Sequence, residues 1–136
     1  MHDAAAIARL VTLLGYELAE DDVPERLSRL RDMRASVLLA ELDGVIVGLA
    51  TMHPASVINR DGDIAWLTAL VVDTGVRGRG VGRALVDAVE TRARELGCER
   101  LSVTTHEHMT DARAFYERVG LEPTGRRFGK MLRGAS

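Results

Sequence analysis

A glycine-rich segment constrains the fold of this chain more than any other part of its sequence. It reads Arg-Gly-Arg-Gly-Val-Gly-Arg over residues 77–83, after an apolar, β-branched run at residues 63–72 and at the start of an amphipathic stretch that ends at Gly97. This order predicts a strand, a tight turn and a helix. Glycines let a backbone approach a ligand closely, and the first amides of a helix attract anions. We therefore expect an α/β protein that binds phosphate at this turn.

The spacing of the glycines excludes two common phosphate-binding motifs. A P-loop needs a lysine directly after its glycines, and the one lysine of the chain, Lys130, is far from this turn. A dinucleotide fingerprint needs G-x-G-x-x-G. That pattern fails because Arg83 holds its last position when the motif starts at Gly78, and Arg77 holds its third when it starts at Gly75.

Composition limits the size and the partners of the protein. A chain of 136 residues, 46% apolar and 28% charged, is typical of one globular domain, which we place at residues 1–136. The formal net charge of −2 provides no electrostatic basis for binding nucleic acid. All 18 basic residues except Lys130 are arginines. This excess reflects either genomic base composition or, for some of the arginines, phosphate binding.

The cellular setting is inferred from what the sequence lacks. The single Cys98 cannot form an internal disulfide, which fits a reducing compartment. Neither a signal-peptide pattern nor an apolar run of 18 residues is found. We therefore expect a cytoplasmic protein that makes no contact with a membrane.

Apolar periodicity predicts the remaining elements. The expected helices lie at residues 4–14, from Pro24 onward, at 81–96 and at 111–119, and the expected strands at 36–42, 45–52, 63–72, 101–105 and 122–132. Asp3 and Thr110 are expected to cap helices. The pair Asp43-Gly44 predicts a tight hairpin turn between the first two strands.

Two motifs resemble one known family. The turn matches [Arg/Gln]-x-x-Gly-x-[Gly/Ala], and residues 115–121, Phe-Tyr-Glu-Arg-Val-Gly-Leu, match that family's closing Tyr-x-x-x-Gly-[Phe/Leu]. With the hairpin, they follow the order of the GCN5-related N-acetyltransferase (GNAT) family over roughly residues 4–132. The resemblance implies an α/β (α+β) fold, a three-layer α/β/α sandwich on a mixed, mostly antiparallel sheet. Strands 67–72 and 101–105 should be parallel neighbours that splay apart.

The expected departure from the family lies at the start of the chain. Family members begin with a short strand, but Asp3 is already placed to cap the first helix. The first strand is therefore expected to be missing, either shed or truncated.

The resemblance implies acetyl-CoA as co-substrate. The turn would hold the pyrophosphate and the preceding strand would bind the pantetheine arm through its main chain. The residues placed there are Leu70, Val71, Val72, Arg77, Gly78, Arg79, Gly80, Val81, Gly82 and Arg83. Arg77 and Arg79 are expected to face phosphate, with Arg83 as a weaker third.

The resemblance also places Tyr116 as the proton donor to the departing thiolate. Ala112, four residues earlier on the same helix face, would leave room for the thioester. The alternative is that Tyr116 only packs against Phe115.

The base that deprotonates the amine is left open. Glu107 and His106 come first, then His108, the carboxylates of residues 17–25, or a chain of water molecules. The H-E-x-x-H pattern of metalloproteases is absent, so no metal is expected. Met109 stands where the family often carries Asn.

The acceptor is predicted from charge. Five carboxylates lie within residues 17–25, and Glu20, Asp21 and Asp22 are the expected contacts for a small cationic amine, an aminoglycoside or a polyamine-like compound. The alternative for the acidic segment is a merely solvated loop, and the alternative acceptor is a peptide or protein amine. The alternatives for the whole protein are a non-catalytic CoA-binding regulatory module and a nucleotide-binding regulatory domain. A homodimer is expected by analogy alone.

Overall fold

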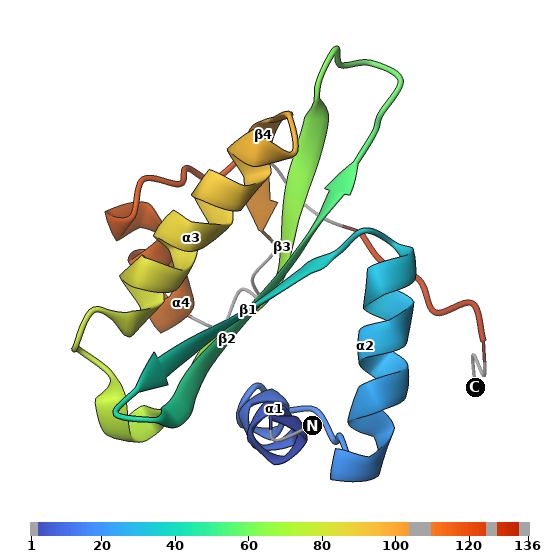
Figure 1. Cartoon of the computed structure of the whole chain (residues 1–136). Helices are drawn as coiled ribbons and strands as arrows, with labels where there is room; N and C mark the ends of the chain where they lie inside the picture. The colour runs from blue at the N-terminus through green and yellow to red at the C-terminus, as the bar shows by residue number, and fades with distance from the viewer. Residues whose placement is uncertain (1–2, 104–109, 125–127, 134–136) are drawn as a thin grey trace. The chain divides into compact units, whose positions relative to one another are not determined.

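The computed structural model describes residues 3–103, 110–124 and 128–133, which belong to two compact units, 1–103 and 104–136 (Figure 1). The elements of the first unit are α1 (Ala4–Leu13), the 3-10 helix η1 (Glu20–Asp22), α2 (Val23–Asp32), β1 (Ser36–Leu42), β2 (Val45–Ala55), β3 (Asp63–Val72), the 3-10 helix η2 (Thr74–Val76), α3 (Val81–Glu95) and β4 (Cys98–Val103). The second unit carries α4 (Thr110–Arg118). None of these helices is long and apolar enough to span a membrane.

The sheet of the first unit is mixed and mostly antiparallel, as the sequence predicts. Its order is β1-β2-β3-β4, with β1–β2 and β2–β3 antiparallel and β3–β4 parallel. The β1–β2 hairpin turns at Asp43 and Gly44, whose φ angles of 52° and 80° suit the tight turn that follows the twist of the strands. From Asp3 onward, no strand precedes α1 in the described residues.

Helices cover both faces of this sheet (Figure 1). On one face Ile7 and Leu10 of α1 and Val23 of α2 pack with Leu49 and Val71. On the other face, α3 buries residues Leu85, Val86, Val89 and Ala93. Gly48 allows this close approach, because a Cβ there would lie 2.9 Å from Leu85 Cδ1.

A bulge in β3 marks the place where the strand parts from β4. The last parallel pair is Leu67 with Val103, and β3 continues to Val72 without a β4 partner in the described residues. On its other side β3 pairs Ala69 with Thr51 and Leu67 with Met52, so Thr68 is an extra residue. Among the described residues, the stretch after Leu67 therefore has one edge whose main-chain donors and acceptors have no strand partner, which we call the free edge.

Some predicted features of the element ends differ from the structure. Asp3 occupies the cap position of α1, as predicted, but its side chain accepts no capping hydrogen bond. Pro24 is the second residue of α2, and Thr110 lies inside α4. The strand predicted at residues 122–132 is absent from the described parts of that range, where Phe128 and Leu132 are 92% and 91% exposed. The apolar residues in these described parts alternate only weakly and form no buried face, so burial does not stabilise a strand there.

Candidate active site

The turn after β3 is built on two glycines with left-handed backbone. Gly78 and Gly80 have φ angles of 82° and 83°. No atom lies within 4 Å of a Cβ built at either position, so the backbone conformation rather than space requires glycine. The preceding η2 is capped by Asp73, whose carboxylate accepts a hydrogen bond from the Gly75 amide at 3.5 Å.

The beginning of α3 points unpaired amides into this turn. The helix starts at Val81 directly after Gly80, with no side-chain cap. The first amide bonded inside the helix is that of Ala84, which donates to the Gly80 carbonyl at 3.0 Å. The amides of Val81 and Gly82 therefore have no helical acceptor, and the positive end of the helix dipole adds to their attraction for an anion.

The three arginines of the turn are in different situations. Arg77 bends back, and its Nε donates to the Val72 carbonyl at 3.4 Å. Arg79 is exposed and makes no hydrogen bond or ion pair with another described residue. Arg83 is exposed in the first turn of α3. Arg79 is thus the guanidinium most available to a phosphate group.

An ion pair that the sequence does not reveal anchors this region. Arg9 of α1 pairs with Asp73 and also donates to the Ile46 carbonyl at 3.0 Å. The hydrogen bond from Arg9 lowers the pKa of Asp73 below its ordinary value. Because the two residues are 64 positions apart, no local pattern could indicate the pair.

The free edge of β3 contains the residues predicted to bind the pantetheine arm. Leu70, Val71 and Val72 all follow Leu67, the last residue paired with β4. The Val71 side chain is buried in the core beneath α1. The main chain, rather than this side chain, is therefore what the strand can offer to a ligand.

Tyr116 lies on α4 in the second unit, four residues after Ala112, and both are partly buried. Its ring meets that of Phe115 edge to face, with centroids 5.4 Å apart. Burial raises the pKa of Tyr116 to about 12, so the phenol stays protonated at neutral pH. No hydrogen bond between described residues involves its hydroxyl, which is available to another donor or acceptor.

The candidate bases His106, Glu107 and His108, with Met109, lie outside the described residues. In the described part of the chain, no cluster of three or more His, Cys, Asp or Glu residues could hold a metal ion.

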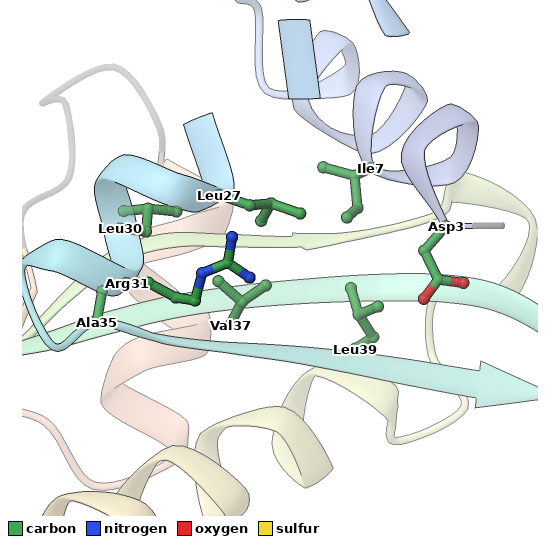
Figure 2. Close-up of a pocket in the computed structure, with 8 residues that line it drawn as sticks. All are labelled: Asp3, Ile7, Leu27, Leu30, Arg31, Ala35, Val37 and Leu39. Carbon is green, nitrogen blue, oxygen red and sulfur yellow. The ribbon is translucent and has the colours of Figure 1, made fainter. Parts of the chain in front are cut away.

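Two cavities lie between the helices α1 and α2 and the sheet. The smaller, of about 240 Å³, is shown in Figure 2, where the guanidinium of Arg31 lies between Leu27 and Val37. The larger, of about 380 Å³, which we call the α2 groove, has Thr51 and Ala69 among its sheet residues and Arg26 and Arg29 among its helix residues.

The predicted acceptor residues lie elsewhere. Glu20, Asp21 and Asp22 are exposed on η1 and line neither cavity. No sequence pattern indicates that Arg26 and Arg29 line the α2 groove, because two arginines three positions apart on a short amphipathic helix look like an ordinary solvated face.

This fold is that of CoA-dependent acetyltransferases. The structure resembles aminoglycoside N-acetyltransferase AAC(6')-Iy, solved in complex with CoA, with a TM-score of 0.81 and 21% identity, over 97% of this chain and 90% of that chain. A model of the acetyltransferase (GNAT) family matches residues 5–121, and the chain belongs to that family.

Two relatives share enough sequence to compare acceptors. An aminoglycoside N(6')-acetyltransferase type 1 of Stenotrophomonas maltophilia is 33% identical over 91% of this chain and 83% of its own length. An aminoalkylphosphonate N-acetyltransferase of Salmonella typhimurium is 30% identical over 77% of this chain and 68% of its own. The protein is an acetyl-CoA-dependent N-acetyltransferase with acetyl-CoA as co-substrate, which confirms the predicted family, enzyme class and co-substrate.

Proposed function

We propose that this enzyme transfers the acetyl group of acetyl-CoA to the primary amine of a small molecule, by direct attack in a ternary complex. One observation carries the proposal. The free edge of β3 leads, through the Gly78–Gly80 turn, into the unpaired amides of α3. An extended arm on the strand and a pyrophosphate at the helix start would bind to one continuous stretch of main chain.

Each predicted cofactor residue has a proposed role at this stretch. The main chain of Leu70–Val72 binds the pantetheine arm, and the turn with the amides of Val81 and Gly82 holds the pyrophosphate. Arg79 supplies the main positive charge, because Arg77 already donates to the Val72 carbonyl and Arg83 lies beyond the glycine turn, in the first turn of α3. We assign both units, residues 1–136, to one acetyltransferase domain.

The reaction needs an acceptor for the amine proton and a hydrogen-bond donor for the departing sulfur. The neutral amine nitrogen attacks the thioester carbonyl carbon, a carbon–nitrogen bond forms, and the carbon–sulfur bond breaks. The amine gives up one proton to His106, Glu107 or water. The departing sulfur takes on negative charge, and the phenol of Tyr116, which stays protonated at neutral pH, is the proposed hydrogen-bond donor to it. Ala112, one turn earlier, leaves space beside the hydroxyl.

Two acceptor classes are supported by different residues. A cationic amine such as an aminoglycoside is supported by the exposed carboxylates Glu20–Asp22 and by the name of the Stenotrophomonas relative. An amine that also carries an anion is supported by Arg26 and Arg29 in the α2 groove and by the name of the Salmonella relative.

Release of free thiol from acetyl-CoA with a panel of primary amines tests the function. Amine-dependent release at a rate above hydrolysis is expected. Calorimetric binding of CoA without any such release would favour a non-catalytic CoA-binding module. Binding of ATP or NAD but not CoA would overturn the assignment of the glycine turn.

The cellular setting and the oligomeric state are proposed separately. The lone Cys98 supports a cytoplasmic location, which fractionation of cells would test. A homodimer is expected from the family, and light scattering of the purified chain would test it.

A further inference from the structure

We propose that the acceptor amine carries an oxyanion, a carboxylate or a phosphonate, and that Arg26 and Arg29 bind this group in the α2 groove. The inference rests on the proposed function, since it names the acceptor class of the same reaction. It makes the two arginines specificity-determining residues of the enzyme.

The two arginines lie on one flank of α2. They are three positions apart, so their side chains leave the helix on the same side, and both line the α2 groove. Arg31 leaves the opposite flank and lines the smaller cavity (Figure 2). The sequence of α2 therefore divides its arginines between two cavities.

Arg26 and Arg29 have no charged partner among the residues that the structure describes. No hydrogen bond or ion pair between described residues involves Arg26 or Arg29, although the carboxylates Glu25 and Asp32 lie on the same helix. Two guanidinium groups without a carboxylate partner leave forked donors available for a planar carboxylate or a phosphonate.

The other residues that line the α2 groove carry no charge, so the two arginines set its electrostatic preference. Apart from Arg26 and Arg29, every residue that lines it is apolar except Thr51. Among the described residues that line the groove, the only formal charges are therefore positive, on the exposed side chains of Arg26 and Arg29. An oxyanion is attracted there, whereas a polycation is repelled. The volume of about 380 Å³ suits a small molecule.

The floor of the groove connects this anion site with the reacting strand. Ala69 of β3 and Thr51 of β2 line the groove and are direct partners across the sheet. The Thr51 hydroxyl lies 2.7 Å from that of Thr68, the first residue of β3 beyond its last pair with β4. An acceptor held by its anion at α2 thus has its amine directed towards the part of β3 proposed to bind acetyl-CoA.

Matched acceptors separate the anion from the amine. Thiol release is measured with 2-aminoethylphosphonate and with ethanolamine, its counterpart without an anionic group. It is also measured with β-alanine and its uncharged-end counterpart β-alaninamide, and with the polycation kanamycin A. The inference predicts that kcat/KM is at least about tenfold higher for an anionic amine than for its neutral counterpart, the effect of one charge-assisted contact. The phosphonate and carboxylate arms show which oxyanion is preferred.

Two variants assign the effect to the arginines. Arg26→Gln and Arg29→Gln are each expected to lower kcat/KM for the preferred anionic amine about tenfold or more, mainly through KM. The fall in kcat/KM should be smaller for ethanolamine, which has no anionic group for the arginines to bind. Arg31→Gln is the control. It removes the same charge from the same helix, but Arg31 lines the other cavity.

The outcomes distinguish this inference from the proposed function. Equal or faster acetylation of the neutral amines or kanamycin A, unchanged in the two variants, would overturn the anion site and leave acetyl transfer intact. If no amine releases thiol, the proposed function fails, and calorimetric titration with 2-aminoethylphosphonate decides the anion site. Binding that Arg26→Gln abolishes supports it, and no binding to the wild type overturns it.

Discussion

Replacing Tyr116 with Phe tests how the leaving thiolate is stabilised. The ring would keep its edge-to-face contact with Phe115, so the change removes one hydroxyl and little packing. None of the hydrogen bonds between described residues depends on that hydroxyl. The stability of the fold should therefore change little, and a change in rate can be assigned to the reaction.

The expected loss of rate in Tyr116→Phe depends on the acidity of the phenol. Burial raises the pKa of Tyr116 to about 12. A free thiol has a pKa of about 8.5, so complete proton transfer from this phenol to the thiolate would be uphill by ~5 kcal/mol. We therefore expect the hydroxyl to act chiefly as a hydrogen-bond donor to the sulfur while the carbon–sulfur bond breaks. A hydrogen bond to a charged group contributes about 1.5–3 kcal/mol, or roughly 10- to 150-fold in rate.

The assay is steady-state thiol release with saturating amine, together with urea unfolding of both proteins. Tyr116→Phe should lower kcat by about 10- to 150-fold and leave the KM for acetyl-CoA unchanged. In the wild type, kcat should not fall between pH 8 and 10 through ionisation of Tyr116, because its pKa lies higher. A variant with full kcat would refute any role in the reaction. A loss above roughly 10⁴-fold would refute the hydrogen-bond account and indicate obligatory proton transfer.

Three further predictions concern the glycine turn and its anchor. Arg79→Gln should raise the KM for acetyl-CoA about tenfold with little change in kcat, and Arg77→Gln should have a smaller effect because Arg77 donates to the strand. An equal fall in kcat would contradict a pure binding role. Gly80→Ala should cost about 1–2 kcal/mol in urea unfolding because of its positive φ, and should weaken CoA binding in a calorimetric titration. Because Arg9 lowers the pKa of Asp73, their pair stabilises the fold above the ordinary value of 3.8 and loses its effect as pH falls through the folded-state value. Acid unfolding curves of Arg9→Gln that match the wild type would contradict this.

Elements bounded by clear turn signals could be predicted from the sequence. The run at residues 63–72 ends at turn residues on both sides, and β3 has those bounds. The hairpin at Asp43-Gly44 was equally clear, since both positions need positive φ. The predicted strand at residues 122–132 had only weak alternation, and its exposed Phe128 and Leu132 show no buried face.

The site was harder to predict because its parts come from distant segments. The turn could be recognised, since its glycines are adjacent in sequence. The pairing of Arg9 with Asp73 and the joining of Arg26 to Thr51 in one groove depend on the tertiary fold. Charge alone indicated the segment Glu20–Asp22 as acceptor site, although its residues do not line either cavity.

The extra residue at Thr68 changes the phase of β3. Leu67 and Val71 are both odd-numbered, and in an unbroken strand they would share a face. Leu67 instead pairs with Met52, on the same face as Gly48 and α3, whereas Val71 lies beneath α1. Deleting one residue at this point would exchange the α1 face and the α3 face for one half of the strand. Odd-numbered residues of β3 therefore face α3 before the bulge and α1 after it, and the free edge begins where this phase changes.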